Sequence, residues 1–435
     1  MKKACFLLML LIVGALVFAG GGGQSSGSTV SLSLWGGYPE QEPFYKQAAE
    51  AYSRLHPNVT IEILTMPLRE SEQKYAAAIP SNTSSDIMET SPFNAVKYIE
   101  GGFIPALTAA GEAFVKAQGR YTQATIDSVY YNGKAYSMPF FQGRCAMYWN
   151  TEMFREAGLT RPPTTFAEMS EYASKLVKYD AQGNMIRSGH SLRVSGQGSG
   201  IGQKFSYVLF PMGGNVIIES TTSPGKYHAG YDNDAGRRAF KYYMDALYSA
   251  KWDSFNVKHD AEAFMLEQTA MFFRESNVVG DLAKNAPNVK YDVAFIPGDI
   301  RRGRIMNPVN FYFSKTCKNI DVATDFVIHM LSDDNQRLML DTVGWLPSRA
   351  DVDYSSVLNR KPQYKAFLEY PADLTEYYEP RITPFDEIQT KFADKLANAF
   401  LDASLAGNDA AIAKFLADSA AETNTILRQN GLYAE

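Results

Sequence analysis

Residues 30–64 read VSLSLWGGYPEQEPFYKQAAEAYSRLHPNVTIEIL, and this stretch decides the fold. Leucine and valine alternate with serine over 30–34, which predicts a β-strand ending at Trp35-Gly36-Gly37. Apolar residues then recur at helical spacing over 44–55, and alternation returns over 59–63. A strand, a helix and a strand within ~35 residues form a βαβ unit, so we predict an α/β protein with doubly wound, parallel sheets. Ligands of such sheets bind beyond the carboxyl ends of the strands, where Gly36 to Glu40 lie.

The later chain repeats this pattern of strands, turns and capped helices. Asn132-Gly133 predicts a tight turn, and residues 147–149 a short strand. Asn150 can cap a helix that Gly158 ends, and Thr165 with Glu168 forms a capping box that opens a helix reaching Tyr179. Further predicted elements are a Ser/Gly-rich loop over 188–202, a strand over 291–295, a helix over 320–331 and helices from 385 onward.

The first 27 residues have the layout of an export signal followed by a tether. Two lysines precede an apolar run, and Val17 and Ala19 occupy the −3 and −1 positions of a cut before Gly20, which predicts a signal peptide over 1–19. The apolar span of roughly 15 residues is short for a bilayer. Residues 20–27 are Gly- and Ser-rich and predict a flexible tether of the kind found in bacterial lipoproteins. The lipid-anchor Cys is not found at the expected position, which holds Gly20, so we expect a soluble protein in the periplasm or at the outer face of the cytoplasmic membrane.

Composition excludes several classes of function. The chain has 435 residues, 46% hydrophobic and 20% charged, which is a globular composition of two or three domains or two lobes. Its net charge of −5 argues against nucleic acid as a partner. The Gly-rich run 196–202 matches neither a dinucleotide fingerprint nor a P-loop, and the five histidines form no metal motif. We therefore predict no cofactor, no metal and no catalytic residue, and we expect a monomer. Pairing of Cys145 with Cys317 stays open, because sequence does not give their separation.

Three blocks carry a family resemblance: NGKAYSMPF at 132–140, YWNTEMFREAGL at 148–159 and PPTTFAE at 162–168. They resemble the extracellular solute-binding proteins of ABC importers, specifically family 1, the large carbohydrate-binding family that includes maltose-binding protein. Asn132 replaces the usual Asp, and Phe166 replaces the usual Trp. Shorter matching blocks follow in the family's order, at 76–87, 264–271, 295–298 and 344–347.

The resemblance implies a two-lobed periplasmic-binding-protein fold of type II, whose lobes are joined by crossover hinge strands. Lobe 1 would comprise residues 28–140 and 310–349, and lobe 2 residues 141–309 and 350–435. The ligand would lie in the cleft between them, and binding would favour a hinge-closed form.

The resemblance also implies which residues bind the ligand, because these lie on loops at strand ends and near the crossovers. Aromatic rings cover the apolar faces of a sugar, and polar side chains exchange hydrogen bonds with its hydroxyl rim. The implied ligand-binding residues are Tyr38, Glu40, Glu89, Thr90, Phe141, Gln142, Arg144, Gln203, Lys204, Asn215, Phe273, Arg274, Glu275, Asn310 and Trp345. Arg144, Arg274 and Lys204 would also suit a phosphorylated or acidic sugar.

The function that follows is capture of a carbohydrate, a mono- or oligosaccharide, and its delivery to the transmembrane permease of an ABC transporter, without catalysis. Two alternatives stay open at this point. An exported glycoside hydrolase would use the same aromatic residues, but it needs two carboxylates ~5–9.5 Å apart. A sugar-sensing subunit for a membrane receptor would keep the fold and change the partner.

Overall fold

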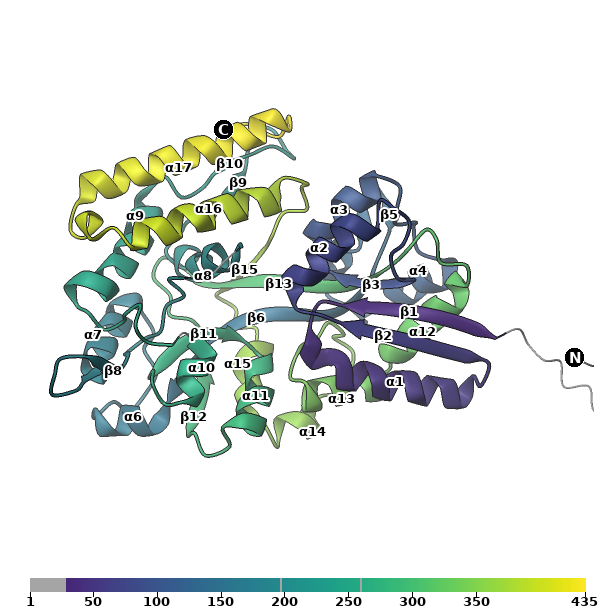
Figure 1. The fold of residues 1–435 in the computed structure, drawn as a ribbon, viewed down its shortest axis with the longest axis horizontal. Helices are drawn as coiled ribbons and strands as arrows, with labels where there is room; N and C mark the ends of the chain where they lie inside the picture. The colour runs from purple at the N-terminus through teal and green to yellow at the C-terminus, as the bar shows by residue number, and fades with distance from the viewer. Residues whose placement is uncertain (1–28, 196–197, 259) are drawn as a thin grey trace, which may run out of the picture.

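The computed structural model describes residues 29–195, 198–258 and 260–435, and the predicted signal peptide and tether lie outside these ranges. The chain forms two lobes side by side (Figure 1). We call the half that contains β1 (Val30–Gly36), β2 (Val59–Thr65) and β3 (Ile87–Thr90) the first lobe. The half that contains β11 (Met271–Glu275) and β12 (Tyr291–Ala294) is the second lobe. No helix in the described ranges combines the length and the apolar character that crossing a bilayer requires.

The elements follow one another in three stretches. The first comprises β1 (Val30–Gly36), η1 (Pro39–Gln41), α1 (Glu42–Leu55), β2 (Val59–Thr65), α2 (Leu68–Ala78), β3 (Ile87–Thr90), α3 (Pro92–Glu100), α4 (Ala109–Lys116), α5 (Gln123–Asp127), β4 (Tyr130–Tyr131), β5 (Lys134–Ala135) and β6 (Met138–Asn150). The second comprises α6 (Thr151–Glu156), α7 (Phe166–Leu176), β7 (Lys178–Tyr179), β8 (Met185–Arg187), α8 (Gly200–Leu209), β9 (Ile217–Glu219), β10 (Tyr227–Ala229), α9 (Asp234–Met244), the π-helical turn η2 (Asp245–Ser249), α10 (Asp260–Met265), β11 (Met271–Glu275), α11 (Asn277–Asn285) and β12 (Tyr291–Ala294). The third comprises β13 (Arg302–Phe313), α12 (Ile320–Met330), α13 (Asp333–Thr342), β14 (Leu346–Pro347), α14 (Ser355–Leu358), η3 (Pro362–Tyr364), α15 (Lys365–Leu368), β15 (Leu374–Tyr378), α16 (Phe385–Phe400), η4 (Ala403–Leu405) and α17 (Asp409–Gln429).

One sheet runs through both lobes. Among the described residues it has nine strands, with the main order β11-β6-β13-β3-β1-β2. β1 pairs in parallel with β2, Leu32 opposite Ile61, and in parallel with β3, so the predicted βαβ unit is confirmed. β6 and β13 are antiparallel to each other and to their other main-order neighbours, whereas β15 pairs in parallel with β13, so the sheet is mixed.

β6 and β13 carry the chain from one lobe to the other. The early part of β6 pairs with β13 and β14, and its later part pairs with β11 and β12. β13 runs the opposite way and ends against β3, with a shift in register between Val309 and Asn310. The short strand predicted over 147–149 is therefore the end of a strand of 13 residues. The predicted α/β architecture with crossover strands is confirmed.

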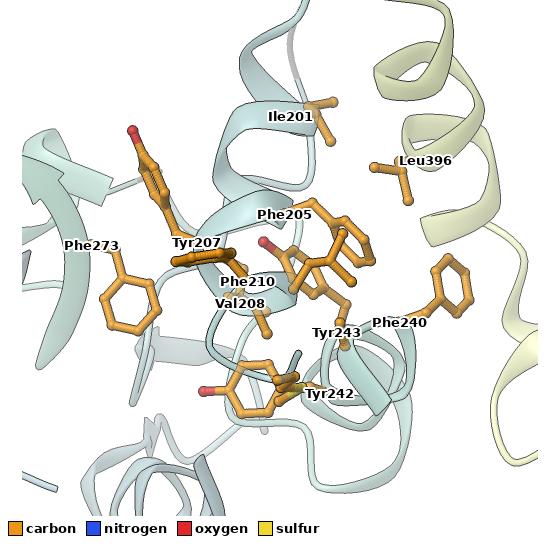
Figure 2. Packing of buried hydrophobic residues seen from close by; sticks show 14 of the residues in the cluster. Ile201, Phe205, Tyr207, Val208, Phe210, Phe240, Tyr242, Tyr243, Phe273 and Leu396 are labelled. Carbon is orange, nitrogen blue, oxygen red and sulfur yellow. The ribbon is translucent and has the colours of Figure 1, made fainter. Parts of the chain in front are cut away.

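Each lobe buries apolar side chains on both faces of its part of the sheet. In the first lobe, α1, α12 and α13 cover one face, with Phe44, Phe311 and Phe326 in the core. α2 and α3 cover the other face, around Tyr75 and Tyr312. In the second lobe, the larger core joins α7, α8, α9 and α16, and Figure 2 shows its aromatic side chains packed together. A smaller core beneath α10, α11 and α15 covers the opposite face.

Local signals in the sequence set several element boundaries. The side chain of Asn150 accepts hydrogen bonds from the backbone of residues 152 and 153, and that of Thr165 accepts one from Glu168. Asn132 and Gly133 both have positive φ and form the tight turn between β4 and β5. Two boundaries were predicted wrongly. α7 ends at Leu176 because residues 178–179 pair with β8, and α8 begins at Gly200, inside the predicted loop.

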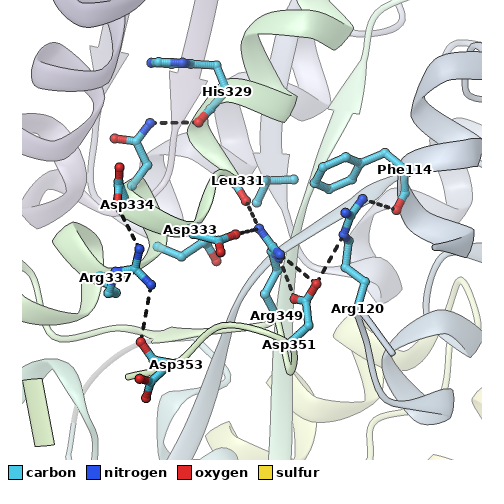
Figure 3. Close-up of polar contacts among 12 residues, drawn as sticks. Phe114, Arg120, His329, Leu331, Asp333, Asp334, Arg337, Arg349, Asp351 and Asp353 are labelled. Atoms are coloured by element: carbon cyan, nitrogen blue, oxygen red, sulfur yellow. Dashed lines mark hydrogen bonds and ion pairs between the residues drawn. The ribbon is translucent and has the colours of Figure 1, made fainter. Parts of the chain in front are cut away.

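An ion-pair network fixes the segment that follows β14 in the first lobe (Figure 3). The buried guanidinium of Arg349 contacts Asp333 Oδ1 at 2.6 Å and Asp351 Oδ2 at 2.7 Å, and it donates to the carbonyl of Leu331 at 2.9 Å. Burial alone would lower the pKa of Arg349, but the two carboxylates outweigh it and the pKa is raised. Arg337 makes a similar pair with Asp334, whose side chain is 94% exposed.

We expect Arg349→Ala to lower the free energy of unfolding by about 2 kcal/mol, because it removes a buried guanidinium that holds two part-exposed carboxylates and the Leu331 carbonyl together. Arg337→Ala is the matched control, and it should cost less than about 1 kcal/mol because an exposed pair is screened by water. Urea denaturation of both variants measures the two costs. Equal costs for the two variants would show that burial does not strengthen the Arg349 network.

Candidate functional site

A cavity of about 360 Å³ lies between the two lobes, where β6 and β13 cross. Its first-lobe side comes from the loop after β1, the start of α2, the start of α3 and the turn before β14. Its second-lobe side comes from α8, the end of β11 and the start of α11. The lining residues are Tyr38, Glu40, Pro67, Leu68, Arg69, Glu72, Ser91, Phe93, Phe141, Gly143, Arg193, Gly200, Gln203, Lys204, Arg274, Glu275, Asn277, Asn307, Pro308, Val309, Trp345 and Glu379.

Three aromatic rings form one wall of the cavity. The ring of Tyr38 meets Phe141 at 5.1 Å and Trp345 at 5.3 Å edge to face, and Phe141 lies 4.8 Å from Trp345. Such pairs add ~0.5–1.5 kcal/mol each beyond the burial of their area, so the rings hold one another in place. The indole nitrogen of Trp345 donates to Glu40 Oε1 at 3.0 Å, and burial raises the pKa of Glu40. The wall is therefore apolar, with Tyr38 as its most exposed ring and a carboxyl group beside Trp345.

A charged cluster forms the facing wall. Lys204 Nζ lies 3.2 Å from Glu275 Oε1, Tyr207 donates to the same oxygen at 2.6 Å, and Arg274 Nε lies 3.5 Å from Glu275 Oε2. Burial alone would raise the pKa of Glu275, but Lys204 and Arg274 lower it to about 2. The carboxylate is therefore ionised and fixed. Tyr207 also accepts a hydrogen bond from Asn307 at 3.3 Å, which ties this wall to β13.

Several polar atoms in the cavity have no partner within the protein. Among the described residues, Arg193 Nε, Asn277 Oδ1 and Asn307 Oδ1 are buried and make no hydrogen bond. Buried polar groups in native proteins nearly always have a partner, so these atoms offer hydrogen-bonding positions in the cavity that water or a bound molecule fills. The aromatic wall and these atoms together fit a small polar molecule with apolar faces.

Side chains of the two lobes also meet beside the cavity. Arg69 in α2 pairs with Glu72 and donates to Ser199, at the start of α8. Phe93 meets Phe385 at 5.8 Å, edge to face. Burial raises the pKa of Glu379, on the segment between β15 and α16, to about 8, and the nearby Asp386 adds to the rise. The lobes thus lie against each other in this structure.

Eight of the fifteen residues named from the sequence line the cavity. They are Tyr38, Glu40, Phe141, Gln203, Lys204, Arg274, Glu275 and Trp345. Their contact with a ligand stays a prediction.

The structure places the other seven away from this cavity, and two of them lie on β6. Gln142 donates to Thr125 at 2.7 Å, and Arg144 donates to the carbonyl of Phe367 at 3.0 Å. Successive side chains of a strand point to opposite faces, so Phe141 and Gly143 face the cavity while Gln142 and Arg144 face away from it.

The remaining five are held elsewhere. Glu89 is buried beneath Tyr38, where it accepts from the backbone of Gly37 at 3.4 Å and from Tyr45. Thr90 lines a separate hollow of about 290 Å³ between the lobes. The other three are Asn215, in the loop before β9; Phe273, which packs on His190 in the second-lobe core (Figure 2); and Asn310, which donates to Ser137.

Seven polar lining residues were not expected from the sequence: Arg69, Glu72, Ser91, Arg193, Asn277, Asn307 and Glu379. Arg69 and Glu72 follow the second strand of the βαβ unit, so the rule on carboxyl ends of strands could have found them. Arg193 sits in a Ser/Gly-rich loop, and no local pattern indicates it. Within the described ranges, no group of three or more His, Cys, Asp or Glu side chains is placed to hold a metal ion, and Cys145 and Cys317 are free thiols.

We expect Glu89→Gln to flatten the loss of stability as pH rises. Burial raises the pKa of Glu89 to about 8, so the folded protein keeps a proton that the unfolded chain releases near pH 4.5. The stabilising effect of this proton is complete below about pH 4.5 and is lost as pH rises through about 8, at up to ~1.4 kcal/mol per pH unit. Urea denaturation of wild type and variant between pH 5 and 8 measures the difference. Glu171→Gln on the exposed surface of α7 is the control, and parallel curves for wild type and Glu89→Gln would contradict the prediction.

Comparison with known proteins places this chain in a known family. The family model described as bacterial extracellular solute-binding protein matches residues 47–366. A protein of Brucella abortus (strain 2308), described only as a binding protein, is 21% identical over 394 residues, which is 89% of this chain and 90% of that protein.

Solved structures share the fold. An ABC substrate-binding protein from Listeria monocytogenes in complex with cycloalternan has a TM-score of 0.75 at 17% identity, over 92% of this chain and all of the other. The maltose-bound MalE3 of T. maritima has a TM-score of 0.75 at 19% identity, over 91% of this chain and all of the other. The two-lobed periplasmic-binding-protein fold is thereby confirmed. With nearly three quarters of its length matched by the family model, the chain belongs to the bacterial extracellular solute-binding proteins.

Proposed function

We propose that this solute-binding protein captures a carbohydrate, a mono- or oligosaccharide, in the cavity between its lobes and delivers it to the permease of an ABC transporter. The observation that carries the proposal is the pairing of an aromatic wall, Tyr38, Phe141 and Trp345, with a charged wall around Glu275. A sugar ring has apolar faces for the first wall and hydroxyl groups for the second. Proteins of the same fold with cycloalternan and with maltose bound support this ligand class.

The proposal includes closure of the lobes around the ligand. Lobe 1 comprises residues 28–140 and 310–349, and lobe 2 residues 141–309 and 350–435, so the boundaries fall where β6 and β13 cross. Closure is a population shift, which a ligand favours only if it contacts the closed form better than the open one. A sugar between the two walls meets that condition because Tyr38 and Trp345 belong to lobe 1, whereas Lys204, Arg274 and Glu275 belong to lobe 2.

Release of the ligand unchanged is also part of the proposal. The ligand-binding role needs no proton transfer, and Glu275, the most firmly held carboxylate of the cavity, is fixed by Lys204, Arg274 and Tyr207. The protein acts outside the cytoplasm, as its family does, after removal of a signal peptide over 1–19, and it acts as a monomer with no nucleic-acid partner.

We expect Trp345→Phe to weaken binding of the sugar about 5- to 30-fold, because a smaller ring without the indole N–H covers less of the ligand and releases Glu40. The ligand-induced change in tryptophan fluorescence should also largely disappear, since among the four tryptophans Trp345 alone is a lining residue. A sugar panel screened by thermal shift identifies the ligand, and fluorescence titration gives the affinities.

Trp35→Phe is the control variant. Trp35 stacks on Tyr75 with Lys74 above it and lines no part of the cavity. The Trp35→Phe variant should keep both the affinity for the sugar and the ligand-induced change in fluorescence. A wild-type protein that responds to peptides or metal ions and to no sugar would refute the carbohydrate ligand, and turnover of a chromogenic glycoside would refute the non-catalytic role.

A further inference from the structure

Three cationic side chains, Arg193, Lys204 and Arg274, lie in the charged wall of the cavity. Lys204 is paired with Glu275, and Arg274 contacts both Glu275 and Asp260, at 3.5 and 3.9 Å, although Asp260 is not a lining residue. Of these three cations, Arg193 alone makes no ion pair with a described residue.

Arg193 is the cation of this wall without an acidic partner among the described residues. Its half-buried guanidinium makes no hydrogen bond or ion pair with any described residue, and its buried Nε has no partner. Burial lowers the pKa of Arg193. The carboxylate of Asp260 offsets part of this lowering, and the positive charge of Arg274 adds to it. The protein thus holds a partly dehydrated cation beside a second cation, which is costly unless an anion joins them.

The guanidinium of Arg193 packs against the start of α8. Gly200, at the start of α8, lies so close that a Cβ there would sit 2.9 Å from Arg193 Cζ, so a larger residue would displace the guanidinium. The backbone N–H groups of the first turn of α8 add positive potential on the same side, because Ser199 makes no capping hydrogen bond with its side chain. Both features favour a negatively charged group next to Arg193.

We infer that the captured carbohydrate carries an anionic substituent, a carboxylate or a phosphate, which Arg193 binds with its guanidinium on the side of the cavity that Arg274 and α8 form. This inference rests on the proposed carbohydrate function and narrows its substrate class to acidic sugars. Arginine suits the role because its planar donors match carboxylate and phosphate oxygens in pairs. Arg144, which the sequence suggested for such a role, faces away from the cavity and is engaged by Phe367.

Isothermal titration calorimetry with matched ligand pairs tests the inference. The pairs are digalacturonate with galactobiose, and trehalose 6-phosphate with trehalose, so that carboxylate and phosphate are distinguished. The wild-type protein should bind the acidic member of at least one pair at least 10-fold more tightly. Arg193→Gln should lower that preference by at least 10-fold, and Arg193→Lys should keep part of it. Arg301→Gln is the matched control, since Arg301 is a half-buried arginine stacked on Phe210 outside the cavity.

The outcomes separate the inference from the proposed function. Equal affinity for the neutral and acidic members of the pair that binds would overturn the acidic substrate class and leave carbohydrate capture intact. An unchanged preference in a folded Arg193→Gln variant would overturn the role of Arg193. Binding of sn-glycerol 3-phosphate, lost in Arg193→Gln, with no binding of any saccharide, would support the anion subsite and refute the carbohydrate function. A wild-type protein that binds none of these compounds contradicts both.

Discussion

The antiparallel pairing of β6 with β13 is the constraint on which the rest of the structure depends, because this ladder belongs to both lobes. Its regularity is broken at the crossing. Pro308, opposite Gln142, has no N–H to donate, and the register shifts between Val309 and Asn310. Gly143 allows close approach, since a Cβ there would lie 3.2 Å from that of Asn307. The two lobes are thus joined where the sheet is least regular, which is also where the cavity lies.

The alternation of side chains along β6 explains which of the residues predicted near the first crossover line the cavity. Proximity to a crossover correctly indicated the segment, but every second residue of a strand faces the opposite side. Phe141 and Gly143 line the cavity, while Gln142 and Arg144 point to the opposite face of the strand and donate hydrogen bonds to Thr125 and Phe367. Predicting the face required knowing that 138–150 is one continuous strand. The sequence pattern predicted only residues 147–149 of this strand, because a strand buried on both faces shows no alternation of polar and apolar residues.

Predictions succeeded where the cause is local. A cap such as Asn150, a turn such as Asn132-Gly133 and the βαβ unit of residues 30–64 are each determined within a few turns of chain. Arg193 and Asn307 are functional candidates for a different reason, namely that segments more than 100 residues apart in sequence meet around them. No local sequence pattern predicts that these distant segments come together in the fold. The lining residues that the family resemblance supplied, such as Trp345, came from position in a known fold and not from the physics of their own segment.

The unpartnered atoms of the cavity connect the geometry to the closing of the lobes. Leaving a buried polar atom without a hydrogen bond costs ~1–3 kcal/mol, and Arg193, Asn277 and Asn307 each contribute such an atom when the lobes lie together. An open arrangement would let water reach these atoms, so the empty closed form is disfavoured by several such costs at once. A ligand that supplies the missing partners removes them only in the closed form. Differential contact of this kind is what a population shift requires. Under the proposed function, these atoms would therefore couple closure of the lobes to binding of the ligand.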